Sequence, residues 1–144
     1  MKMTSRASIA TKRRPERAAA RPVRESTETR ARLRERLVIH LNELGYTVPA
    51  PAVVGPFEPE LRRRNPYRGS VVYGATVTTA DLGNPKQHER LVFFASRRTR
   101  KRATIQLYIA VAAKNRDRLD ALLERLSVRT HARGGNVQLV LVED

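Results

Sequence analysis

The chain has 144 residues, 40% of them hydrophobic and 5% aromatic, and it contains no Cys. This length allows one modest domain, and the lack of Cys excludes disulfide bonds, thiolate metal sites and Cys nucleophiles. The formal charge of +15 predicts a polyanionic partner, of which nucleic acid, either DNA or RNA, is the leading class.

The first 24 residues hold eight Lys or Arg and one acid, so this segment alone has a formal charge of +7. It has no hydrophobic periodicity, and Pro15 and Pro22 interrupt any helix. We therefore predict a disordered basic arm over residues 1–25, followed by a single α+β domain over residues 26–144. Four cations near the middle of the arm are candidate nucleic-acid-binding residues: Lys12, Arg13, Arg14 and Arg17.

The arm also has the composition of an organelle transit peptide, because residues 1–24 are rich in Arg and poor in acids. The two prolines weaken the amphipathic helix that such a peptide forms. We therefore expect a cytoplasmic or nucleoid-associated protein and keep the transit peptide as the minority alternative.

A first helix is predicted over residues 27–44. Ser26 is a suitable N-cap, and Gly45 can end the helix in the left-handed conformation. Four leucines at helical spacing form one apolar stripe: Leu33, Leu37, Leu41 and Leu44. The opposite face has balanced charge, so we expect this helix to cover the core rather than to bind phosphate.

Residues 47–69 contain five prolines and predict an extended, irregular connection. Three successive arginines lie within it, Arg62, Arg63 and Arg64. A connection of this length in a small domain is often functional, so these arginines are candidate binding residues.

The periodicity then changes to two. Alternating residues predict a strand over residues 71–79, and residues 81–85 form a turn. The apolar run at residues 91–94 is consistent with a central strand covered on both faces. Alternation resumes over residues 103–111, which we interpret as a strand rather than a helix because of its β-branched residues.

Asn115 is a suitable N-cap for a second amphipathic helix over residues 116–127. Gly134 and Gly135 break the chain before a terminal strand over residues 137–142. The predicted order is therefore α-β-β-β-α-β, with a four-stranded mixed or antiparallel sheet packed by two helices.

Five cations occur within residues 97–102, on what we predict to be a hairpin connection: Arg97, Arg98, Arg100, Lys101 and Arg102. Arginine forms bidentate contacts with phosphate, and each neutralised phosphate adds affinity that falls as salt rises. We therefore expect this segment to be the main site on the folded domain. The alternative is a solvated turn whose charges discourage aggregation at a sheet edge.

Four aromatic residues lie on the predicted strands: Tyr73, Phe93, Phe94 and Tyr108. Sheets that bind single-stranded nucleic acid stack bases on such residues. No Gly-aromatic pattern typical of an RNA-recognition motif surrounds them, so we expect core packing, above all for the Phe pair.

The predicted α-β-β-β-α-β order resembles the core of restriction-endonuclease-like nucleases. In that family an acid ends one strand, and a Glu-x-Lys type motif on the next strand completes a Mg²⁺ site. Asp81 matches the first acid, but residues 93–97 contain no acid for the second. The resemblance therefore implies a catalytically inactive relative that keeps a DNA-binding surface.

Together these observations predict a non-enzymatic nucleic-acid-binding protein without a cofactor, a metal or catalytic residues. One alternative is an interaction or assembly module for a ribonucleoprotein or another acidic partner. The other is the inactive restriction-endonuclease-like fold. No segment approaches the roughly 20 apolar residues of a membrane span, so we expect none.

Overall fold

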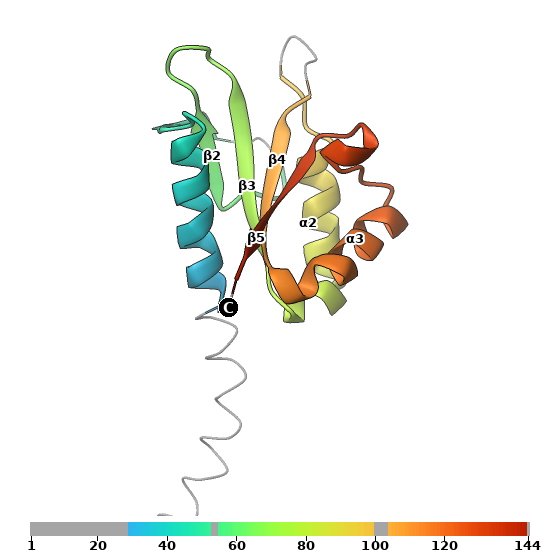
Figure 1. The fold of residues 1–144 in the computed structure, drawn as a ribbon. Helices are drawn as coiled ribbons and strands as arrows, with labels where there is room; N and C mark the ends of the chain where they lie inside the picture. Colours follow the sequence, from blue (N-terminus) through green and yellow to red (C-terminus); the bar gives the residue numbers. More distant parts are fainter. Residues whose placement is uncertain (1–28, 53–54, 100–103, 144) are drawn as a thin grey trace, which may run out of the picture.

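The protein is an α+β structure in which helices cover both faces of a mixed five-stranded sheet (Figure 1). The computed structural model describes residues 29–52, 55–99 and 104–143. The basic arm predicted over residues 1–25 lies outside the described residues. No helix in the described ranges is long and apolar enough to cross a membrane.

A first helix runs through residues 29–43 and is followed by two short strands and a long one. The remaining chain alternates between helices and strands. In chain order the elements after the first helix are β1 (Val48–Pro49), β2 (Leu61–Arg64), β3 (Val71–Val77), the 3-10 helix η1 (Ala80–Gly83), α2 (Pro85–Ala95), β4 (Gln106–Ala112), η2 (Ala113–Asn115), α3 (Arg116–Arg125), η3 (His131–Arg133) and β5 (Val137–Val142).

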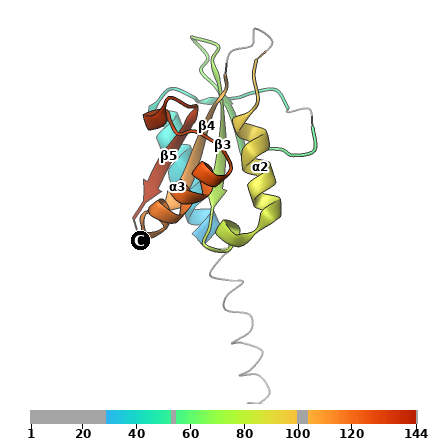
Figure 2. The same cartoon turned by 90° about the vertical axis from the view of Figure 1, so that its right-hand side faces the viewer.

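The strands lie side by side in chain order, from β1 to β5. β1, β2 and β3 form antiparallel pairs, whereas β3, β4 and β5 are parallel to one another. Parallel neighbours require a crossover, and α2 and α3 provide the two crossovers. Both helices lie on one face of the sheet, and the helix at residues 29–43 lies on the other (Figures 1 and 2).

Each face of the sheet has its own apolar core. On the α2 and α3 side, Phe94, Leu119 and Leu123 pack against inward-facing residues of β3 and β4 and are fully buried. On the other side, three leucines of the predicted stripe, Leu33, Leu37 and Leu41, are buried against the sheet, whereas the fourth, Leu44, is exposed. Burying each such leucine contributes about 1.5–3 kcal/mol, so the helices on both sides are held by their apolar faces.

Gly74 allows close packing between the first helix and β3. A Cβ at this position would lie 2.9 Å from Cδ2 of Leu37 and 3.1 Å from Cβ of Leu61. A side chain here would therefore require the side chains of Leu37 and Leu61 to shift.

Several predictions from the sequence are confirmed. The helices expected over residues 27–44 and 116–127 are present through the described residues 29–43 and over Arg116–Arg125. The strands expected over residues 71–79, 103–111 and 137–142 correspond to β3, β4 and β5. Phe94 is a core residue, as expected, and Phe93 is half-buried against the core; Tyr73 and Tyr108 are core residues as well.

The strand predicted at residues 91–94 is wrong, because this segment is the last part of α2. Asn84 caps the helix by accepting a hydrogen bond from the backbone N–H of Lys86 at 3.0 Å, and Pro85 occupies the first turn. Only Leu91 and Phe94 are buried, at a spacing of three residues. A short apolar run has no period of its own, so the capping signal at residues 84–85 was the one that distinguished a helix.

The predicted hairpin at residues 97–102 is also wrong, since the segment joins α2 to β4 in a parallel crossover. The expected four strands are five, because the connection at residues 47–69 contributes β1 and β2. β1 and β2 are too short to show the alternation of apolar and polar residues that predicts a strand.

Candidate functional site

The amino ends of β3, β4 and β5 lie at one end of the sheet, because these strands are parallel. The segments that lead into them are residues 65–70, 96–105 and 128–136, and their described parts lie at this end of the sheet, in the upper part of Figure 1. Their described residues include five basic residues and no acid: Arg68, Arg97, Arg98, Arg129 and Arg133. We call this region the basic end.

Acids lie at the opposite end of the sheet. Among the described residues, the segments before β2 and after β3 and β5 include Glu60, Asp81 and Glu143, and the segment after β4 includes one cation, Lys114. We call this region the acidic end. The described chain begins here, at residue 29, so the arm is attached at the end opposite to the basic loops.

The three arginines of β2 are divided between the two faces of the sheet. Arg62 and Arg64 are paired in register with Tyr73 and Val71, which pack into the core on the α2 side. Arg63 is paired with Val72, which belongs to the core under the first helix. Because paired residues share a face, only Arg62 and Arg64 lie on the α2 side.

Arg62 and Arg97 both act electrostatically on the phenol of Tyr73. Burial raises the pKa of Tyr73 above its usual value, and the positive charges of Arg97 and Arg62 oppose that increase. Arg97 also lies over the ring of Phe93, with its guanidinium carbon 4.8 Å from the ring centre. Arg62 is also 3.7 Å from a carboxylate oxygen of Glu58 and donates from Nε to the backbone oxygen of Ala50 at 3.4 Å, so its charge is partly compensated.

The side chain of Arg98 contacts Thr104 on the second stem of the connecting loop. Its Nη1 donates to the hydroxyl of Thr104 at 3.3 Å, which ties the two stems of the connecting loop together. Arg100, Lys101 and Arg102 lie outside the described residues, as do Lys12, Arg13, Arg14 and Arg17 of the arm.

Three basic residues of the basic end were not among the binding residues predicted from the sequence. Arg68 lies in the turn between β2 and β3, and Arg129 and Arg133 lie in the segment before β5. Arg133 is 3.0 Å from a carboxylate oxygen of Glu124, whereas the side chain of Arg129 has no partner among the described residues. Residues 128–136 contain no acid, and this feature of the sequence could have identified Arg129 and Arg133 as candidates.

At the acidic end, Asp81 is engaged by Arg30 from the first helix. Arg30 Nη2 donates to both carboxylate oxygens, at 2.9 and 3.0 Å, and Arg30 Nη1 donates to the hydroxyl of Thr76 at 3.1 Å. That hydroxyl donates in turn to Glu60, and the backbone N–H of Thr78 donates to Asp81 at 2.9 Å. Asp81 therefore has a cation and an N–H as partners. Among the described residues, no group of three or more His, Cys, Asp or Glu could hold a metal ion.

No protein-family model matches the chain, and no curated protein or solved structure matches it.

Proposed function

We propose that the protein is a non-enzymatic nucleic-acid-binding protein whose basic end contacts the phosphate backbone. The observation that carries this proposal is that three segments whose described residues include five basic residues and no acid lie at the amino ends of three parallel strands. Contacts to the backbone provide affinity without sequence specificity, and the basic arm adds to that affinity.

Several charges of the basic end are available to a ligand. The side chains of Arg68 and Arg129, and that of Arg64 at the adjoining end of β2, have no hydrogen-bond or ion-pair partner among the described residues, whereas Arg133 is paired with Glu124. Arg97 contacts an aromatic ring, which leaves its charge uncompensated by an acid. A cluster of uncompensated cations repels itself unless counterions or phosphates neutralise it, so binding to a polyanion relieves this repulsion.

The test is a salt titration of the full chain with a labelled oligonucleotide, read by fluorescence anisotropy. We expect the logarithm of the affinity to fall linearly with the logarithm of salt between about 50 and about 200 mM. An affinity that does not change over this range would overturn the proposal.

A pair of matched variants locates the binding surface. Replacing Arg97 and Arg98 with Gln should reduce the salt slope by about 0.7 to 0.9 for each phosphate that is no longer neutralised. The control replaces Arg34 and Arg36 with Gln, which removes the same charge from the exposed face of the first helix. Equal slopes for the two variants would mean that net charge alone attracts the ligand and that the basic end is no site.

The same titration separates the alternative, an interaction module for a ribonucleoprotein or another acidic protein. Such a module would bind its purified acidic partner with an affinity that the replacement of Arg97 and Arg98 reduces, and it would bind free DNA and RNA only through the arm. Retention of oligonucleotide binding after neutralisation of the arm therefore favours the nucleic-acid proposal.

A second candidate is the inactive restriction-endonuclease-like fold. It is supported by the element order of residues 29–112, which is helix, β1, β2, β3, α2 and β4, although these are not the elements that the sequence suggested. Arg30 donates hydrogen bonds to both carboxylate oxygens of Asp81, and this positive charge opposes the binding of a metal cation there. Plasmid incubated with Mg²⁺ or Mn²⁺ should therefore stay intact, and cleavage that disappears in Asp81→Ala would overturn this candidate.

A further inference from the structure

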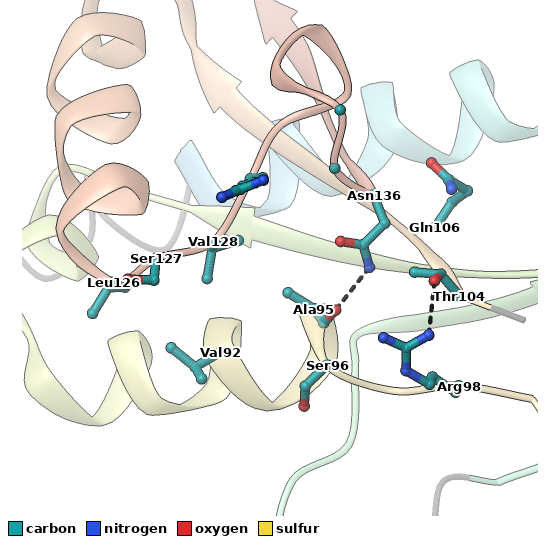
Figure 3. Close-up of a pocket in the computed structure, with 13 residues that line it drawn as sticks. Val92, Ala95, Ser96, Arg98, Thr104, Gln106, Leu126, Ser127, Val128 and Asn136 are labelled. Atoms are coloured by element: carbon teal, nitrogen blue, oxygen red, sulfur yellow. Dashed lines mark hydrogen bonds between the residues drawn. The ribbon is translucent and has the colours of Figure 1, made fainter. Parts of the chain in front are cut away.

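A pocket of about 480 Å³ opens at the basic end, between the last turns of α2 and α3 (Figure 3). Its walls come from four separate segments, which are the end of α2, the two stems of the loop before β4, residues 126–129 after α3, and residues 134–136 before β5. This volume is within the range of pockets that bind small organic groups.

One wall of the pocket is apolar. Val92 on α2 is a large hydrophobic residue with 39% of its surface exposed, and Leu126 and Ala95 complete the wall. An exposed valine inside a hollow, rather than on an open surface, offers a flat apolar group something to pack against.

The rim of the pocket is positively charged. Arg98 and Arg129 reach it from different segments, and none of the thirteen residues that line it is an acid. Gly135 makes this arrangement possible, since a Cβ there would lie 2.0 Å from the backbone oxygen of Arg129. The loop can therefore pass close to Arg129 and hold it beside the pocket.

The floor of the pocket is fixed by Asn136. Its side-chain amide donates to the backbone oxygens of Ala95 and Ile105, at 2.7 and 2.9 Å, so it joins β5 to the end of α2 (Figure 3). The side-chain oxygen of Asn136 has no partner among the described residues. It is therefore available to accept a hydrogen bond from a ligand.

We propose that this pocket receives one unstacked base of a single-stranded nucleic acid. The base packs against Val92 and Leu126, the oxygen of Asn136 accepts a hydrogen bond from its edge, and the adjoining phosphates contact Arg98 and Arg129. An apolar wall beside a cationic rim is the combination used for single strands, where stacking and backbone contacts act together. The inference rests on the proposed nucleic-acid binding and adds that the protein prefers single strands and contacts a base.

The experiment compares three labelled probes on the full chain by fluorescence anisotropy. They are a single-stranded oligonucleotide, the same backbone with abasic sites, and a blunt duplex of the same sequence. We expect the single strand to bind about tenfold more tightly than the abasic strand, because the abasic strand keeps the phosphates and lacks the bases. Equal affinity for these two probes would overturn the inference and leave backbone binding intact.

Two pairs of variants tie this preference to the pocket. Val92→Glu should remove the preference for bases, whereas Ile39→Glu, which adds the same charge at an equally exposed apolar residue of the first helix, should keep it. Arg129→Gln should weaken the single-strand complex severalfold, and Arg118→Gln on the exposed start of α3 should not. Thermal melts establish that each variant is folded.

The outcomes separate the two proposals. If no probe binds at low salt, nucleic-acid binding and the pocket proposal both fail. If the probes bind but Val92→Glu and Ile39→Glu behave alike, only the pocket proposal fails. Displacement by a nucleoside monophosphate at the concentrations that the strand requires would show a site for free nucleotides and would likewise overturn it.

Discussion

The two ends of the sheet use charge in opposite ways. At the acidic end, the carboxylates of Asp81 and Glu60 are tied to Arg30 and Thr76, and Arg32 donates to the backbone oxygen of Glu143. At the basic end, Arg68 and Arg129 have no such partners among the described residues, whereas Arg133 is 3.0 Å from Glu124. Charge at the acidic end therefore holds the first helix to the sheet, whereas part of the charge at the basic end is not paired with an acid. Stability and binding should respond separately to substitutions at the two ends.

The largest expected effect is on stability, at the acidic end. Arg30→Ala leaves the buried carboxylate of Asp81 without its cation, and we expect the free energy of unfolding to fall by about 2 kcal/mol. This value is below that of a fully buried pair, because 37% of the Arg30 side chain is exposed. Urea denaturation measures the change, with Arg34→Ala on the same helix as control. A loss of nucleic-acid affinity in folded Arg30→Ala would break the division between the two ends.

The next effect concerns the arm. Replacing Lys12, Arg13, Arg14 and Arg17 with Gln should lower the salt slope by up to about 0.7 for each phosphate that the arm no longer neutralises, with no change in stability. Since the arm is attached at the acidic end, we expect it to add affinity independently of the loops. The test is whether the preference for a single strand over the abasic strand survives in this variant. Its disappearance would place the site on the arm.

A smaller effect distinguishes the two faces of β2. Arg64 and Arg63 are adjacent and both half-buried, but Arg64 lies on the α2 side and Arg63 on the side of the first helix. Arg64→Gln should weaken oligonucleotide binding about threefold and Arg63→Gln should leave it nearly unchanged. Anisotropy titrations of the two variants at one salt concentration measure the difference. The opposite ranking would move the interface to the other face.

The smallest effect is a pH dependence. Burial raises the pKa of Tyr73, so in the folded protein the phenol stays neutral above pH 10, where the unfolded chain begins to ionise. Below that pH the contribution of Tyr73 to stability is fully present, and it is lost as pH rises toward the folded pKa. We expect the Tm to fall less steeply in Tyr73→Phe than in the natural chain between about pH 9 and about pH 11. Parallel slopes would mean that the phenol is not buried beside Arg62 and Arg97.

Much of the fold could be predicted from local patterns. The leucine stripe at Leu33, Leu37 and Leu41 indicated a helix that covers a core, and the alternation in β3, β4 and β5 indicated strands. The four apolar residues at 91–94 carried no such period, and the capping signal of Asn84 and Pro85 was interpreted as a turn. Because residues 91–94 were predicted as a strand, the connection at residues 97–102 was predicted as a hairpin. The parallel arrangement of β3, β4 and β5 was therefore not predicted.

The sequence by itself determined that the protein is strongly basic, that its first helix has an apolar stripe, and that its cations cluster in the arm, in β2 and at residues 97–102. It did so because charge and periodicity are local properties of the chain. Only the tertiary structure decided that the described parts of residues 65–70, 96–105 and 128–136 lie at one end of the sheet, and that Arg63 lies on the opposite face from Arg62 and Arg64. Parallel pairing brings the amino ends of β3, β4 and β5 together across long sequence separations, and the pleat sends neighbouring side chains to opposite faces.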